Sequence, residues 1–242
     1  MARDWEGKHK ALTFSFDDGV TQDRRLIEIL NAYGLKATFN LNSSLLGLPN
    51  RLVRNGHDIS HDKNTAERAP EIYRGHEVAV HTLTHPMLPE LDDATVTWQV
   101  EEDRRALSSL FGYEVVGMAY PGGGVNNDAR VAKVIGATTG VRYARTITSS
   151  YSFAPQNNLM QFNPTVYYIE VEKLFSLGRE FLSLETDDDT VFYVWGHSYE
   201  MDAEYISWKK FEDFCREISG KNDIYYCSNR EALLHMPPPP VL

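Results

Sequence analysis

The sequence is poor in the features that mark secreted, membrane-spanning and nucleic-acid-binding proteins. Its 242 residues include only two cysteines, Cys215 and Cys227, which we expect to be reduced thiols in the core. No segment approaches the roughly 20 uninterrupted apolar residues of a membrane span. The start of the chain lacks the apolar segment of a secretory signal, so we expect either a cytoplasmic protein or one whose leader is not part of this sequence. The formal net charge of −10 argues against nucleic acid and membrane partners.

The residues that are present suit one α/β domain. A hydrophobic content of 42% is enough for a real core, and 242 residues is a natural length for a single α/β barrel. The only low-complexity stretch is the proline run at 237–240, which cannot continue a helix. We therefore predict one domain over residues 1–242.

Predicted strands alternate with predicted helices along the chain. The expected strands are residues 11–16, 37–41, 77–81, 115–119, 141–144, 191–195 and 224–227. The expected helices lie between Thr21 and Gly34 and over 91–110, 127–135, 170–182 and 207–218, with Thr21, Asp92 or Asp93, and Asn127 as caps. This alternation predicts a mostly parallel sheet of about seven strands, closed or nearly closed into a barrel.

Residues 43–70 interrupt this alternation. The segment is polar, is broken by Gly47, Pro49 and Gly56, and has no firm period. We interpret it as a long insertion with room for short helices, of the kind that often covers a binding site. It contains His57 and His61, and we expect both on the surface.

The most informative stretch is residues 11–19, where an apolar run leads into Asp17, Asp18 and Gly19. Neighbouring side chains leave a strand on opposite faces, so the two carboxylates can serve different roles at one strand end. Glycine allows a sharp turn directly after them. The same pattern also fits a plain strand that ends in an Asp-Gly turn.

Polar residues recur where predicted strands end, which is where parallel α/β folds gather their working side chains. These residues are Asp17 and Asp18 after the first strand, His81 and His85 after the third, Gly122–Gly124 after the fourth, Arg145 after the fifth and His197 after the sixth. The recurrence predicts an active site at this edge of the sheet.

The spacing of His81 and His85 predicts two imidazoles on one side of a helical turn, within reach of one cation. A carboxylate from another strand end would complete a set of two histidines and one carboxylate, which leaves positions open for water and substrate. A zinc-like ion lowers the pKa of bound water towards roughly 7, as hydrolysis needs. The histidine spacing alone fits a purely structural pair equally well.

Three motifs resemble those of the polysaccharide deacetylase (NodB-like) family. Residues 15–19 (SFDDG) are similar to its Thr-Phe-Asp-Asp-Gly motif, residues 81–85 (HTLTH) to its His-Ser/Thr-x-x-His motif, and residues 194–197 (VWGH) to its late Leu-x-x-His motif. Their order and spacing agree from about residue 11 to 226.

The resemblance implies a distorted (β/α) barrel and metal-dependent removal of an N-acetyl or O-acetyl group from an acetylated carbohydrate or a related small molecule. It implies one divalent ion, zinc or alternatively cobalt, nickel or manganese. The residues that it assigns are Asp18, His81 and His85 as metal ligands, Asp17 as general base, His197 as general acid, and Gly122 with Tyr120 at the oxyanion and substrate.

Two of the family's motifs are altered. Its Arg-x-Pro-Tyr motif appears as residues 119–122 (AYPG), so the arginine that ordinarily pairs with the base is missing. We predict that Arg145, at the end of the fifth strand, replaces it; Arg142 lies deeper and on the opposite face, and a surface position for Arg145 fits the sequence equally well. The Asp-x-x-Asp-Trp motif that supports the acid histidine has no match between residues 140 and 165.

Other functions fit the same scaffold. The chain could hydrolyse a small non-sugar amide, although the intact metal set counts against this. It could be an inactive carbohydrate-binding protein, although Asp17 and His197 count against that. A phosphoryl-transfer site on Asp17 would need more than the glycines at 122–124. The aromatic residues near 151–168 could stack on a sugar or pack under the barrel rim, and the oligomeric state is left open.

Overall fold

The computed structural model describes residues 5–240, which form an eight-stranded parallel sheet and a separate hairpin. The strands of the sheet are β1 (Lys10–Asp17), β2 (Ala37–Leu41), β5 (Glu77–Val80), β6 (Gly117–Ala119), β7 (Tyr143–Arg145), β8 (Val166–Tyr167), β9 (Thr190–Gly196) and β10 (Ile224–Tyr226). Their order is β7-β6-β5-β2-β1-β9-β8, and β10 also pairs with β1. The sheet curls into a half-barrel, which confirms the predicted distorted (β/α) barrel with about seven parallel strands.

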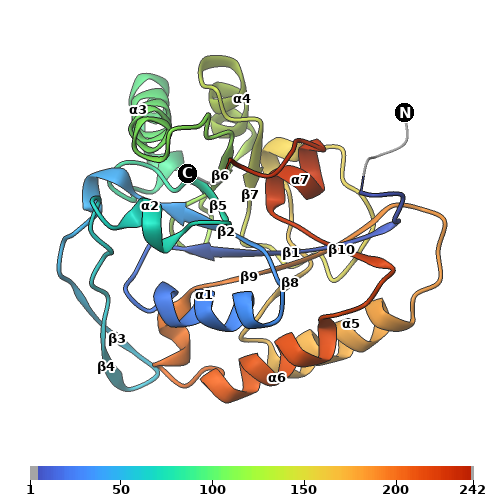
Figure 1. The fold of residues 1–242 in the computed structure, drawn as a ribbon. Helices are drawn as coiled ribbons and strands as arrows, with labels where there is room; N and C mark the ends of the chain where they lie inside the picture. The colour runs from blue at the N-terminus through green and yellow to red at the C-terminus, as the bar shows by residue number, and fades with distance from the viewer. Residues whose placement is uncertain (1–4, 241–242) are drawn as a thin grey trace.

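Helices connect the strands and pack outside the sheet, except the last one, whose Asn229 accepts a hydrogen bond from Thr13 on the inner face of β1. They are α1 (Asp23–Ala32), α2 (Ala69–Ile72), α3 (Asp93–Phe111), α4 (Ala129–Thr138), α5 (Val171–Ser183), α6 (Trp208–Ile218) and α7 (Asn229–Leu234). Figure 1 shows α3 and α4 side by side at one end of the molecule and α1, α5 and α6 at the other, with the sheet between them. Every predicted strand and helix is present. After residue 72, the strand and the α-helix that were not predicted are β8 and α7, which are too short for a hydrophobic period to reveal them.

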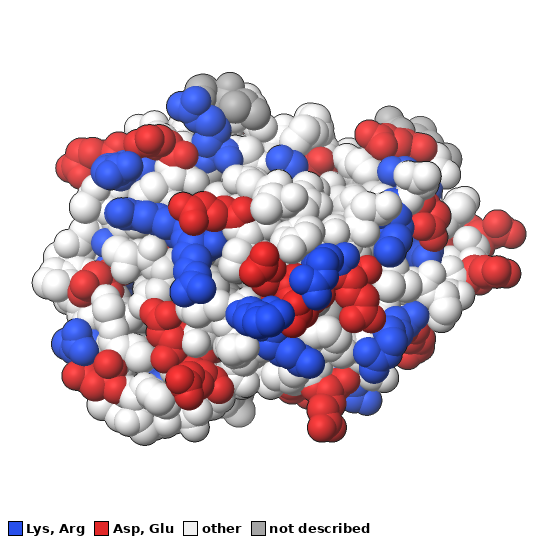
Figure 2. Space-filling model, turned by 60° about the horizontal axis from the view of Figure 1, so that its bottom comes forward, with Lys and Arg blue, Asp and Glu red and all other residues white. Residues whose placement is uncertain are grey.

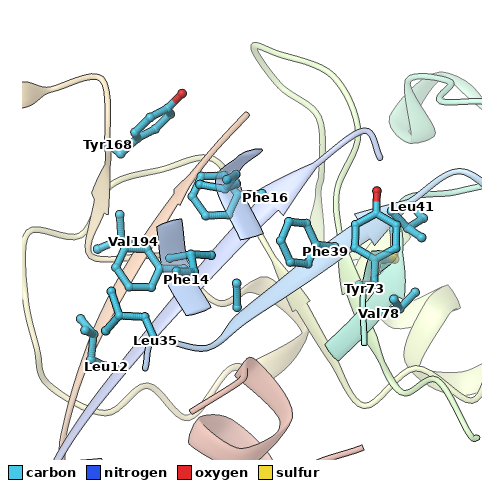
Figure 3. Packing of buried hydrophobic residues seen from close by; sticks show 14 of the residues in the cluster. Leu12, Phe14, Phe16, Leu35, Phe39, Leu41, Tyr73, Val78, Tyr168 and Val194 are labelled. Atoms are coloured by element: carbon cyan, nitrogen blue, oxygen red, sulfur yellow. The ribbon is translucent and has the colours of Figure 1, made fainter. Parts of the chain in front are cut away.

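Strand β1 is the centre of the fold and pairs with β2, β9 and β10. All eight of its residues are buried. On its outer face, Phe14 and Phe16 pack in a row with Phe39 and Tyr73 (Figure 3). Asp17 lies level with Asn40 of β2, and Phe16 lies level with Gly196 of β9. The register therefore brings the carboxyl ends of three strands to one place.

The helix caps agree only in part with the sequence. Asp92 caps α3, as predicted, and its carboxylate accepts a hydrogen bond of 2.8 Å from the Thr95 N–H. Asn127 is not the cap of α4; Asp128 is, because its carboxylate accepts from the Val131 N–H at 2.7 Å. Helix α1 begins after Gln22 without a side-chain cap, so the predicted cap at Thr21 is wrong.

The insertion at 43–70 contains a β-hairpin that the sequence analysis did not predict. Its strands are β3 (Arg51–Arg54) and β4 (His57–Ser60), which pair antiparallel. Asn55 and Gly56 join them with φ of 48° and 78°, the conformation that favours Asn-Gly in two-residue hairpins. His57 is exposed as expected, but the prediction for His61 is wrong: it is buried, with 8% of its surface exposed.

Both cysteines are buried and unbonded. Figure 2 shows acidic and basic side chains interspersed over one face of the molecule. Within residues 5–240, no helix has the length and apolar character that crossing a membrane requires.

Candidate active site

A cavity of about 490 Å³ opens at the carboxyl ends of the central strands. Its walls come from these strand ends, from the loop that follows β6 and from the insertion. The lining residues are Asp17, Asp18, Leu45, Asn50, Leu52, Arg54, His61, Lys63, His81, His85, Tyr120, Gly122, Gly123, Ile147, Tyr167, Trp195, His197 and Tyr199. All the predicted site residues except Arg145 line it, and Arg145 lies directly behind Asp17.

Asp17 is fixed by two hydrogen-bond donors. The Arg145 guanidinium donates from Nη2 to both carboxylate oxygens at 2.5 Å, and Asn40 donates from Nδ2 to Oδ1 at 2.8 Å. Burial raises the pKa of Asp17, but Arg145 and the nearby His81 outweigh it and hold the pKa below its ordinary value. Asp17 is therefore a charged carboxylate with a fixed orientation. A general base must be in this unprotonated state.

Arg145 is fully buried at the end of β7, so the surface alternative for this residue is excluded. Its guanidinium lies over the Trp195 ring, 4.5 Å from the centroid, and Nη1 donates to the Thr146 carbonyl at 3.1 Å. The predicted contact with Asp17 is present. Arg142, in contrast, is exposed.

Asp18 adopts a left-handed backbone with φ of 82°, a conformation that costs energy for residues other than glycine and is concentrated at functional sites. Its Oδ2 lies 3.2 Å from His61 Nε2, and its Oδ1 lies 3.4 Å from Lys63 Nζ. Burial raises the pKa of Asp18, but the Lys63 ammonium and the His61 hydrogen bond hold it well below its ordinary value. Both partners come from the insertion.

His81 and His85 face Asp18, but the turn between them is not helical as predicted. Thr82 and His85 have φ of 67° and 61°, so a left-handed turn brings the rings to a centroid distance of 4.9 Å. His81 Nδ1 donates to the Ala119 carbonyl at 2.9 Å, which leaves the Nε2 lone pair directed at the site. Burial lowers the pKa of His81 to about 4 and also lowers that of His85.

These three residues fit a divalent cation. The Nε2 atoms of His81 and His85 lie 3.9 and 3.7 Å from Asp18 Oδ1, and the three ligand atoms lie within 4.8 Å of one another. Zinc bonds to nitrogen and oxygen are about 2.1 Å long, so small side-chain rotations would bring all three atoms onto one ion. Neutral imidazoles and a charged carboxylate are the protonation states that metal binding needs.

His197 follows β9 and lines the same cavity as the histidine pair. Its Nε2 is 3.8 Å from Asp17 Oδ2, and its Nδ1 is 3.2 Å from Glu200 Oε1. Glu200 is buried, accepts a hydrogen bond of 3.0 Å from the His197 backbone N–H, and accepts a very short one from the Tyr167 hydroxyl. Burial lowers the pKa of His197, but the Glu200 carboxylate outweighs it and raises the pKa to about 9. The imidazole is thus protonated near neutral pH.

Gly122 and Tyr120 lie on the loop after β6. Gly122 has φ of 83°, and both carbonyls of this pair accept from Asn126 Nδ2, at 3.0 and 3.1 Å. The Tyr120 hydroxyl donates to the Met160 carbonyl at 2.7 Å, away from Asp17 and Asp18. Of the aromatic residues near 151–168, Tyr167 lines the cavity, stacked on Trp195 at 4.1 Å between ring centroids.

Three residues of the site, His61, Lys63 and Glu200, were not predicted from the sequence. Glu200 had a recognisable signal, because a glutamate three residues after the N-cap residue of a helix often bonds back to the N–H of that residue. His197 is the N-cap of the short helix Ser198–Met201. His61 and Lys63 had none, because their position depends on how the insertion folds over Asp18.

Comparisons with known proteins agree with this geometry. The family model described as polysaccharide deacetylase matches residues 5–140, more than half of the chain. No curated protein matches the chain in sequence.

Three similar solved structures share the fold. A Mycobacterium smegmatis structure assigned to the polysaccharide deacetylases has a TM-score of 0.64 at 17% identity, with 98% of this chain and 94% of that chain covered. A family 4 carbohydrate esterase from Streptomyces lividans, in complex with acetate, has a TM-score of 0.52 at 14% identity, with 91% of both chains covered. The Streptococcus pyogenes deacetylase PplD, in complex with acetate, has a TM-score of 0.50 at 20% identity, with 62% of this chain and 61% of that chain covered.

Proposed function

The chain belongs to the polysaccharide deacetylase family, and from this premise we propose that it hydrolyses an acetyl group from an acetylated carbohydrate. The observation that carries the proposal is that Asp17 and His197, with Oδ2 and Nε2 3.8 Å apart, line one cavity together with Asp18, His81 and His85. A base, an acid and a set of metal ligands in one cavity are what acyl-group hydrolysis requires.

Asp18, His81 and His85 would hold one divalent cation, and zinc suits this ligand set best, with cobalt, nickel and manganese as alternatives. Such an ion would supply Lewis-acid chemistry to the acetyl carbonyl and would lower the pKa of water. His81 is held in the ligating tautomer by the Ala119 carbonyl, and His61 orients the Asp18 carboxylate. Partners of this kind orient metal ligands and tune their basicity.

Asp17 acts as the general base. Its carboxylate accepts a proton from the water whose oxygen attacks the acetyl carbon. Arg145 keeps this carboxylate charged and pointed into the cavity, as the family's missing arginine ordinarily does. Arg145 touches no reacting atom, so it is a positioning residue.

His197 acts as the general acid. When the bond between the acetyl carbon and the sugar nitrogen or oxygen breaks, Nε2–H donates its proton to the leaving atom, and the products are acetate and the free amine or alcohol. Glu200 serves as its positioning residue, on the opposite side of the ring from Asp17. The backbone N–H of Gly122 is the donor proposed for the developing oxyanion.

The test is acetate release by the wild-type protein. We expect release from N-acetylglucosamine oligomers or acetylated xylan, its loss after chelation, and its recovery when zinc, cobalt, nickel or manganese is added back. If acetate is released only from small non-sugar amides, these amides are the substrate class. If the metal-loaded protein releases no acetate from any acetylated sugar or amide, the proposal is wrong.

A further inference from the structure

The hairpin β3–β4 forms a fixed wall of the cavity. Leu52 packs in a small cluster with Val20, Ile59, Tyr199 and Ala203. At the hairpin tip, Asn55 Nδ2 donates to the Ala203 carbonyl at 2.9 Å. These contacts bind the hairpin to the segment after β9 and fix its backbone beside the cavity, where Leu52 is half-buried and Arg54 is exposed.

Alternation along β3 sends its arginines to opposite faces. Arg51 lies on the outer face, does not line the cavity, and pairs with Asp58 at 3.0 Å. Arg54 lies on the same face as Leu52 and lines the cavity with it. The two arginines are therefore a natural pair for comparison, one inside the site and one outside it.

Arg54 differs from the other charged residues of the cavity because it has no counter-charge. Asp17 is paired with Arg145, and Asp18 with Lys63. Within residues 5–240, no carboxylate forms an ion pair with Arg54, and its guanidinium makes one hydrogen bond, to the Val53 carbonyl at 3.0 Å. The cavity has no carboxylate besides Asp17 and Asp18.

The charge of the cavity is opposite to that of the whole chain. The formal net charge of −10 would repel negatively charged molecules in general. Inside the cavity, however, Lys63 and Arg54 match the charges of Asp17 and Asp18. Next to these residues, the positive charges of Arg145 and of the protonated His197 exceed the one negative charge of Glu200. A divalent cation on Asp18 would add two more. A free guanidinium in such a field is suited to bind a carboxylate or a phosphate.

We infer that the substrate is an acetylated sugar with a negatively charged substituent, a carboxylate or a phosphate, which Arg54 binds. The inference rests on the proposed function, because it places the acetyl group beside Asp17 and His197. It makes the insertion the element that selects the substrate: Arg54 holds the charged substituent while the stacked rings of Tyr167 and Trp195 offer an apolar surface to the sugar.

Two pairs of sugars isolate the charge. N-acetylglucosamine is compared with its 3-O-lactyl ether, which adds a carboxylate, and with its 6-phosphate. Binding is measured by calorimetry and acetate release is measured with the same compounds, using wild type, Arg54→Gln and Arg51→Gln, each loaded with zinc. We expect the wild type to bind one charged sugar about tenfold or more tightly than the neutral one. Tighter binding of the lactyl ether would identify a carboxylate as the group that Arg54 binds, and tighter binding of the 6-phosphate would identify a phosphate.

Arg54→Gln should reduce this preference to less than about twofold, and Arg51→Gln should retain it. Equal binding of charged and neutral sugars by the wild type, or an unchanged preference in Arg54→Gln, overturns the inference even if acetate is released. Tighter binding of a charged sugar that depends on Arg54, without acetate release from any compound, would support the anion site and count against the proposed hydrolysis.

Discussion

The Lys63 ammonium lies 3.4 Å from Asp18 Oδ1, the same oxygen that faces the imidazoles of His81 and His85. A buried cation at this position competes with a metal ion for one carboxylate. At about 4 Å, two unit charges repel each other by about 1 kcal/mol in water and about 4 kcal/mol near a protein surface. The protein thus carries an internal competitor for the cation that it is proposed to bind.

We predict that Lys63→Met binds zinc about tenfold or more tightly than wild type at neutral pH, because 1.4 kcal/mol corresponds to a factor of about ten. Competition with a chromophoric chelator measures the affinity. Lys221→Met, which removes an exposed lysine far along the chain, is the control and should match wild type. Unchanged or weaker binding by Lys63→Met would show that the ammonium does not oppose the metal.

His61 contacts the other oxygen of Asp18 and should have the opposite effect. Asn50 Nδ2 lies 3.2 Å from His61 Nδ1, so Nδ1 accepts and Nε2–H donates to Asp18 Oδ2 at 3.2 Å. Loss of such a partner typically costs about 10–100-fold in metal affinity. His61→Ala is therefore expected to bind zinc that much more weakly, and His57→Ala, from the exposed part of the same hairpin, should bind normally. If His61→Ala binds zinc as tightly as wild type, His61 does not support the metal site.

The pair of Arg145 and Asp17 should matter for stability as well as for catalysis. Arg145→Met leaves the Asp17 carboxylate buried without its cation, and breaking a buried pair in this way costs about 3–5 kcal/mol in free energy of unfolding. Urea denaturation measures the loss, and Arg142→Met serves as the exposed control from the same segment. Adding Asp17→Asn to Arg145→Met should restore part of the stability. If Arg145→Met alone is as stable as wild type, the contact contributes little to the free energy of unfolding.

Glu200 should control the pH range of the reaction. Because the pKa of His197 is raised to about 9, the acid form is present at neutral pH and is lost as pH rises through that value. Glu200→Gln removes the main cause of the increase, so the alkaline fall in kcat/KM should move to lower pH. Glu204→Gln, an exposed neighbour, should leave the profile in place. If kcat/KM of Glu200→Gln falls at the same alkaline pH as that of wild type, Glu200 is not a positioning residue for His197.

The sequence predicted the site residues at strand ends better than it predicted their surroundings. Asp17, Asp18, His81 and His197 could be located because parallel strands place their carboxyl ends together, and this depends only on the alternation of strands and helices. The contact between Arg145 and Asp17 followed from the same rule. The turn at His81 could not be predicted correctly, because Thr82 and His85 adopt left-handed conformations that ordinary residues disfavour.

The insertion shows why the other residues of the site could not be predicted from the sequence. Its Asn55-Gly56 turn was readable as a hairpin signal, but the burial of His61 and Lys63 is a tertiary effect. It arises where the hairpin docks on the segment after β9, and no local pattern encodes that contact. Glu200 lies between these cases: its spacing from His197 is local, while its contact with Tyr167 joins two distant segments.

The rate of acetate release by Asp17→Asn, at a metal content equal to that of wild type, decides whether Asp17 is the general base. The side chain keeps its size and supplies none of the three metal ligands, so we expect full zinc occupancy by elemental analysis. We also expect a rate about 10²–10⁴-fold below wild type on the same acetylated sugar, because the general base is gone. A wild-type rate at full zinc occupancy would contradict the account, since Asp17 would then have no part in the reaction.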